Sequence, residues 1–152
     1  MSMPYSVLLA GEYGQDALRR VFDRIEAVFE SANTTVNTWN PQSDVSRLNE
    51  ATPGKARTVS PELASLFDIV DELCDLTEGR FDPTACIIKL AWTRFMSEHG
   101  HPPLPSDLSH LRFAIGWKTR IKRKSATSVT RHNTNTFVDT DGVAKGYVVD
   151  LL

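Results

Sequence analysis

The residues best suited to chemistry stand in the stretch VDTDGVAKGY, residues 138–147. Gly142 and Gly146 lack a Cβ atom, so the backbone there can approach a ligand closely. Lys145 lies near the start of an expected helix, where a cation does not complement the helix dipole. This placement suggests an anion for Lys145 to meet, and the alternative is an ordinary exposed lysine.

An aromatic side chain stands out in a second stretch, NTWNPQSDVSRLN, residues 37–49. Trp39 comes just before an Asn-Pro turn, and a helix is expected to begin at Ser43 or Asp44. A turn that presents an aromatic ring ahead of a helix is well placed to stack a planar ligand. The alternative is a half-buried tryptophan that closes the core.

The third stretch is EGRFDPT, residues 78–84. Gly79 is expected to end one helix, and Asp82 with Pro83 to begin another, which favours a capping role for Asp82. The backbone amides at that helix start could equally hold the phosphate or ribose of a ligand, with Phe81 as an apolar wall.

Signals of several other site classes are missing from the sequence. It contains no GxGxxG, GxxxxGKS/T or GxSxG, so Rossmann, P-loop and α/β-hydrolase functions have no support. His99 and His101 lack Cys or carboxylate partners at ligand spacing, which favours a surface loop over a zinc site. Cys74 and Cys86 stand in apolar surroundings without CxxC spacing, so buried structural thiols are expected.

Composition and charge narrow the class of protein further. With 152 residues, of which 41% are hydrophobic and 24% charged, the chain is expected to form one globular domain. A net charge of -2 argues against a general polyanion binder. The basic stretch KTRIKRK, residues 118–124, is interpreted as the solvated face of an edge strand, with a phosphate-binding patch as the alternative.

The sequence also gives expectations about location. The first residues lack a basic segment ahead of an apolar run, so no signal peptide is expected. No stretch approaches the roughly 20 apolar residues of a membrane span. Together with the two isolated cysteines, these features favour the cytoplasm or a reducing organelle.

The elements that must position these residues follow from hydrophobic periodicity. A strand is expected over residues 3–10, and strands again over about 113–138. Helices are expected over residues 16–31 with Asp16 as the cap, from Ser60 to Gly79, over 84–97, shortly after Asp107, and from Ala144 onward. Helices on a mainly antiparallel sheet make an α+β fold.

Taken in order, MSMPYSV, NTWNPQSDVSRLN, EGRFDPTACIIKLAW and VDTDGVAKGYVVD resemble the ApbE family of Mg-dependent FAD:protein FMN transferases. Members carry, for example, L-D-L-G-G-I-A-K-G-Y-A-V-D where this chain has VDTDGVAKGYVVD. The resemblance runs from the first residue to the last. It implies a T-fold-like α+β domain that binds FAD and Mg²⁺ and transfers FMN to a Thr or Ser hydroxyl of a target flavoprotein.

The resemblance also implies roles for particular residues. Met1, Trp39 and Lys145 would contact FAD, with Trp39 where the family has an aromatic that can stack on the flavin. The segment that lines the nucleotide would consist of Arg80, Phe81 and Asp82. Gly142 would offer its backbone carbonyl to Mg²⁺.

Several features depart from the family pattern. Asp141 stands where glycine is usual, so its carboxylate would either add to the metal site or crowd it. Members are about twice as long, and their side-chain metal ligands lie in the C-terminal half. Residues 1–152 are therefore expected to form the N-terminal half of such a domain, so transferase activity of this chain stays open.

The resemblance leaves the partner and the function open in part. Some members are fused to fumarate-reductase-like flavoproteins, which makes such a domain the expected partner. The alternative function is a module that binds FAD or docks on a reductase without transferring FMN.

Overall fold

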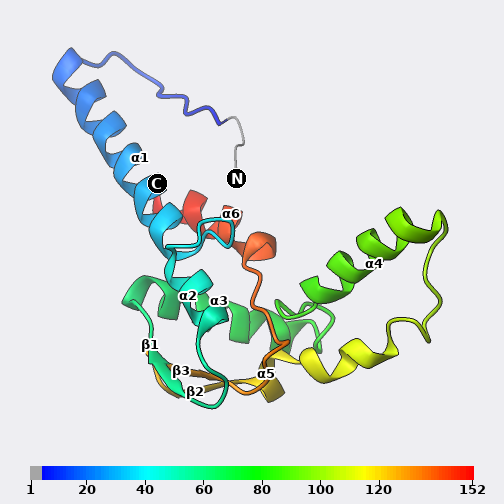
Figure 1. Cartoon of the computed structure of the whole chain (residues 1–152). Helices are drawn as coiled ribbons and strands as arrows, with labels where there is room; N and C mark the ends of the chain where they lie inside the picture. The colour runs from blue at the N-terminus through cyan, green and yellow to red at the C-terminus, as the bar shows by residue number, and fades with distance from the viewer. Residues whose placement is uncertain (1–4) are drawn as a thin grey trace.

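The computed structural model describes residues 5–152 (Figure 1). Its helices are α1 (Gln15–Thr35), α2 (Asp44–Glu50), α3 (Pro61–Leu76), α4 (Cys86–His99), the 3-10 helix η1 (Ser109–Ala114), α5 (Trp117–Arg120) and α6 (Asp141–Leu151). Its strands are β1 (Ala56–Thr58), β2 (Ile121–Ser125) and β3 (Ser128–Arg131). The predicted α+β class is confirmed.

The strands form one antiparallel sheet in the order β1-β3-β2. The hydrophobic core lies where α3 meets α2, the sheet and the start of α6, as Figure 1 shows for these elements. Its largest fully buried side chains include Leu63, Leu66, Phe67 and Val70 of α3. Helix α3 therefore supplies much of the core, and α2, the sheet and the start of α6 pack against it.

The start of α3 was predicted correctly because its signals are local. The Ser60 hydroxyl accepts a hydrogen bond from the Leu63 amide at 3.2 Å, and Pro61 occupies the first helical position. Gly79, beyond the end of the helix, has a φ of 75°, which a glycine adopts without strain.

The prediction for α1 was right about the helix and wrong about its cap. The helix begins at Gln15 after Gly14, whose position receives no side-chain cap, and it continues to Thr35. Asp16 instead lies in the first turn, where a carboxylate complements the positive end of the helix dipole.

The strand predicted over residues 3–10 is wrong for the part that the structure describes. Residues 5–10 belong to no strand, and Leu8 is 94% exposed. A strand requires a partner for its backbone groups, and none of the three strands between residues 5 and 152 lies beside this segment. The ring of Tyr5 instead packs at a tilt against the ring of Phe29 of α1, with 4.5 Å between centroids and 37° between the ring planes.

The strand-rich interpretation of residues 113–138 is correct only for β2 and β3, because η1 and α5 occupy residues 109–120. The basic stretch does include an edge strand: β2 lies at one side of the sheet, with Lys122 and Lys124 exposed. Arg123 turns the other way, and its side chain is only 16% exposed. The three-residue strand β1 was missed.

Helix α4 was predicted two residues too early, and it ends at His99, before Gly100, which has a φ of 73°. It projects away from the rest of the chain (Figure 1), and none of its residues is buried. Helix α6 begins at Asp141 rather than Ala144, because the Ala144 amide already donates to the Thr140 carbonyl at 2.8 Å. No helix within residues 5–152 has the length and apolar character needed to cross a bilayer.

Candidate functional site

Three of the stretches singled out in the sequence meet at the start of α6. The indole Nε1 of Trp39 donates to Oδ2 of Asp141 at 3.3 Å, across 102 positions of sequence. The Asp139 amide donates to the Pro83 carbonyl at 2.8 Å. These contacts bring the tryptophan turn and the RFDPT segment to the same helix start.

The turn that carries Trp39 is tied down by its neighbours while its ring stays exposed. The Asn40 side chain donates to the Asn33 carbonyl at 2.9 Å, and the Ser46 hydroxyl donates to the Thr38 carbonyl at 3.3 Å. Trp39 itself is 69% exposed, which contradicts the alternative of a half-buried core tryptophan. It borders a hollow of about 230 Å³, lined by Thr38, Trp39, Pro41, Ser46, Asn49, Glu50 and Phe137.

Phe81 lies against the first turn of α6. A Cβ atom placed on Gly142 would stand 3.2 Å from Cε2 of the Phe81 ring, which is tighter than ordinary contact. Around Gly146, by contrast, there is no atom within 4 Å of such a Cβ. The missing side chain of Gly142 therefore serves the approach of Phe81, which the sequence had not indicated.

Both carboxylate oxygens of Asp82 accept hydrogen bonds from other residues of the chain. Its Oδ1 accepts from the Thr84 amide at 2.8 Å and from the Thr84 hydroxyl at 2.5 Å, and its Oδ2 accepts from the Trp117 amide at 2.9 Å. It does not cap α4, which begins only at Cys86. Asp82 thus fixes the shape of the turn that presents Phe81.

The other predicted cofactor residues lie at the edge of this region. Lys145 is exposed, one turn into α6. Arg80 is exposed as well and forms an ion pair with Glu78 at 3.5 Å. Met1 lies outside the described residues.

Asp139 was not given a role from the sequence, although it stands in the stretch that was singled out. Its side chain is partly buried just before α6, and its Oδ1 accepts from the Asp141 amide at 2.9 Å. Burial raises the pKa of its carboxyl, the charge of Asp141 raises it further, and the Asp141 amide and Lys89 offset part of this. A carboxylate in this position gains from a nearby cation.

The cysteines and histidines of the chain add no nucleophile or metal ligand to this region. Burial raises the pKa of both thiols to about 11, so Cys74 and Cys86 are neutral at physiological pH. Cys74 is buried as predicted, whereas Cys86 is only partly buried. Residues 5–152 hold no group of three His, Cys, Asp or Glu side chains placed to bind a metal ion.

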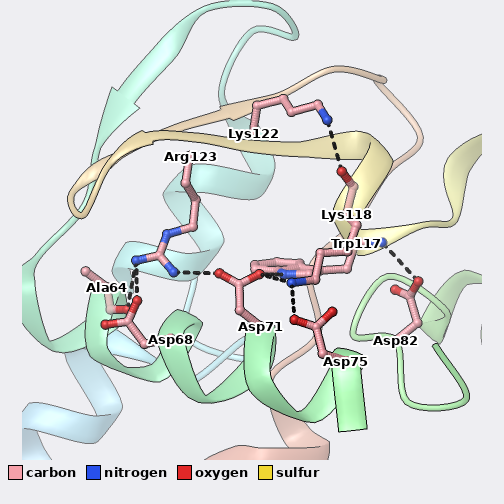
Figure 2. Close-up of polar contacts among 9 residues, drawn as sticks. All are labelled: Ala64, Asp68, Asp71, Asp75, Asp82, Trp117, Lys118, Lys122 and Arg123. Carbon is pink, nitrogen blue, oxygen red and sulfur yellow. Dashed lines mark hydrogen bonds and ion pairs between the residues drawn. The ribbon is translucent and has the colours of Figure 1, made fainter. Parts of the chain in front are cut away.

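A second cluster of charged residues lies between α3 and β2 (Figure 2). Asp71 accepts from the Trp117 indole at 2.7 Å and from Arg123 at 2.8 Å, and Lys118 lies 3.2 Å away. Burial alone would raise the pKa of Asp71, but the three donors outweigh it and hold the pKa below its usual value. This cluster fastens the edge strand to α3.

A hollow of about 280 Å³ lies beside this cluster, lined by Cys74, Asp75, Glu78, Gly79, Phe81, Asp82, Gly116, Trp117, Lys118 and Thr119. Asp75 also pairs with Lys118, at 3.1 Å. The hollow therefore borders both the Asp71 cluster, through Trp117 and Lys118, and the turn that carries Phe81 and Asp82.

Comparison with known proteins places the chain in a family. The ApbE family model matches residues 1–152, so the chain belongs to the ApbE family. A protein of Chlamydia trachomatis serovar D, named FAD:protein FMN transferase, is 30% identical over 153 residues, which cover 100% of this chain and 48% of that protein. A Chlamydia pneumoniae protein of the same name is 30% identical over 152 residues, again with 48% of its length covered. The chain thus spans about half the length of these curated relatives.

Solved structures agree on the fold. The flavin transferase ApbE from Vibrio cholerae superposes with a TM-score of 0.73 at 22% identity, over 95% of this chain and 45% of that one. The apo flavinyl transferase ApbE from Pseudomonas stutzeri gives a TM-score of 0.75 at 21% identity, over 88% and 42%. At these identities the likeness establishes the fold, which is the expected α+β fold of this family.

Proposed function

We propose that this chain forms the flavin-binding part of an FAD:protein FMN transferase, which moves FMN from FAD onto a Ser or Thr hydroxyl of a target flavoprotein. The observation that carries the proposal is the meeting of Trp39, Phe81 and the start of α6. An exposed indole, a phenyl ring and a helix start with a nearby lysine suit a ligand with a planar ring and phosphates. FAD has both.

Each residue has a distinct part in this proposal. Trp39 stacks on the flavin ring, and Lys145 meets a phosphate. Phe81 provides an apolar wall, Arg80 lies beside it at the surface, and Asp82 shapes the turn from within through its three hydrogen bonds.

The residues at the start of α6 fit a magnesium ion, for which they would supply part of the coordination shell. Mg²⁺ in nucleotide sites is commonly held by one or two carboxylates together with phosphates and waters. Asp139 offers a partly buried carboxylate there, whose pKa is raised by burial, and the Gly142 carbonyl is the second expected donor. When bound, the ion would neutralise charge on the phosphoryl group that is transferred.

The target in this proposal is a flavoprotein domain of the fumarate-reductase type. Support for a protein acceptor comes from the names of the relatives, which are FAD:protein FMN transferases. The acceptor contributes the hydroxyl oxygen, which forms the new bond to phosphorus as the bond to AMP breaks.

The proposal is tested by titrating FAD into the purified chain, with and without Mg²⁺, and following flavin fluorescence. We expect saturable quenching that strengthens with Mg²⁺. Replacing Trp39 by Ala is expected to weaken binding about three- to tenfold, the usual range for an aromatic stacking contact. Lys124→Gln on the exposed edge of β2 is the matched control for Lys145→Gln.

The outcomes separate the proposed functions. Equal binding by the wild-type, Trp39→Ala and Lys145→Gln chains would contradict the flavin site. Binding without covalent flavin on an added acceptor domain, seen by in-gel fluorescence, would instead favour the module that binds FAD without transfer.

A further inference from the structure

We propose that Asp141 is a positioning residue that fixes the orientation of the Trp39 ring. The inference rests on the proposed function for its use in flavin binding, but its geometry stands independently. Asp141 is also where this chain departs from the glycine expected at that position. At this position the aspartate, unlike a glycine, accepts a hydrogen bond from the Trp39 indole.

The carboxylate of Asp141 is directed at the tryptophan turn with both oxygens. Its Oδ2 accepts from the indole Nε1 of Trp39 at 3.3 Å, and its Oδ1 accepts from the hydroxyl of Thr38 at 3.5 Å. The Trp39 amide is held separately by the Asn37 side chain at 3.0 Å. Backbone and ring of Trp39 are therefore anchored by different groups.

The segment that carries Asp141 is itself held firmly. The buried Thr140 hydroxyl donates to the Val36 carbonyl at 2.5 Å, and the Asp141 amide donates to Asp139. The Val36 carbonyl lies at the end of α1, immediately before the tryptophan turn. The start of α6 and the turn are thus joined at two places, and the carboxylate is supported by a fixed backbone.

Such an anchor matters because the ring has little else to hold it. Trp39 is 69% exposed, so packing does not select its rotamer. An exposed side chain that must be ordered on ligand binding loses rotamer freedom at that moment, whereas a ring that is already oriented loses less. The two hydrogen bonds also direct the carboxylate of Asp141 toward the turn, which accounts for a carboxylate at a position where glycine is expected.

The test compares Asp141→Ala with Asp141→Asn, because the amide oxygen of asparagine can still accept from the indole. Asp150→Ala, which removes an exposed carboxylate from the same helix, is the matched control. The first readout is the indole Nε1–H signal of Trp39 in ¹H–¹⁵N spectra of the FAD-free chain, assigned by its loss in Trp39→Phe. The second readout is the FAD dissociation constant.

We expect the Trp39 indole signal of Asp141→Ala to move toward that of free indole and its heteronuclear NOE to fall, while Asp141→Asn and Asp150→Ala keep the wild-type NOE. FAD affinity is expected to fall about three- to tenfold in Asp141→Ala and less than about twofold in Asp141→Asn, the range of one hydrogen bond.

An unchanged indole signal in Asp141→Ala would overturn the inference. Equal changes of FAD affinity in the alanine and asparagine variants would also overturn it, because they would assign the effect to the charge. A wild-type chain that binds no FAD would contradict the proposed function, and the indole signal alone would then decide the role of Asp141.

Discussion

Asp71 and Asp139 are both partly buried carboxylates, but one is surrounded by donors and the other is not. Asp71 meets Arg123, Lys118 and the Trp117 indole within 3.2 Å. Asp139 has one hydrogen bond from a backbone amide, and its negatively charged neighbour Asp141 lies two residues away. The pKa of Asp71 is accordingly lowered and that of Asp139 raised.

This difference separates a structural site from a candidate binding site. Around Asp71 every buried charge has a partner within the chain, and the cluster stabilises the contact between α3 and β2. Around the start of α6, by contrast, Asp139 and the exposed Lys145 lie close together in sequence, and the exposed indole of Trp39 contacts Asp141. Carboxyl groups whose pKa is perturbed by burial cluster at functional sites.

Removal of the Asp71 carboxylate should have the largest effect on stability. Asp71→Ala leaves the Trp117 indole without its acceptor and removes one of the two carboxylates that pair with Arg123, which keeps Asp68. We expect the free energy of unfolding to fall by about 2 kcal/mol. Urea denaturation measures this. Asp75→Ala, at a side chain that is 73% exposed, is the control and should cost less than about 0.5 kcal/mol.

Acid should weaken the same cluster. Because the pKa of Asp71 is lower in the folded chain than its ordinary value of 3.8, its contribution is complete above that pH and is lost as the pH falls through the folded pKa. The stability difference between wild type and Asp71→Asn is therefore expected to shrink below about pH 4. A constant difference from pH 7 to pH 2.5 would contradict the assignment.

The two glycines of α6 offer a comparison within the candidate site. Gly146→Ala enters open space and is expected to stabilise the chain by about 0.5 to 1 kcal/mol through helix propensity. Gly142→Ala meets the Phe81 ring at 3.2 Å and should lose most of that gain. Thermal unfolding of both variants checks this, and an equal rise would mean that Phe81 does not rest on α6.

The smallest effect is expected at Asp139, and it has the opposite sign to that at Asp71. Its raised pKa means that the charged form is disfavoured in the folded chain, so Asp139→Asn should stabilise the chain slightly at pH 7, as measured by urea denaturation. The gain should disappear below the ordinary pKa of 3.8. A destabilised variant at pH 7 would show that the carboxylate is paired after all.

The sequence predicted those elements whose signals lie close together along the chain. Ser60 and Pro61 define the start of α3 because a cap acts within one turn. The expected strand is absent from residues 5–10, because strand formers need a partner, which local sequence does not reveal. The strand β1 was missed for a related reason, since three residues with one basic side chain carry no periodicity.

The candidate site was predictable only in part. The resemblance identified the stretches around Trp39, Phe81 and Lys145, and the structure shows the first two meeting at α6. The hydrogen bond between Trp39 and Asp141 spans 102 positions and depends on how α1 meets α6, so no local pattern contains it. The hydrogen bond that Asp82 accepts from the Trp117 amide, 35 positions away, could not be predicted for the same reason, and the one from the Thr84 hydroxyl was also not predicted.

The most direct measurement follows backbone amide shifts of the ¹⁵N-labelled chain during titration with FAD and Mg²⁺. We expect shifts at residues 38–40, at Phe81 and at 139–146, and none at Asp71 or Arg123. Shifts at Cys74, Asp75 and Lys118, with residues 38–40 and the start of α6 unaffected, would contradict the distinction between the two aspartate sites.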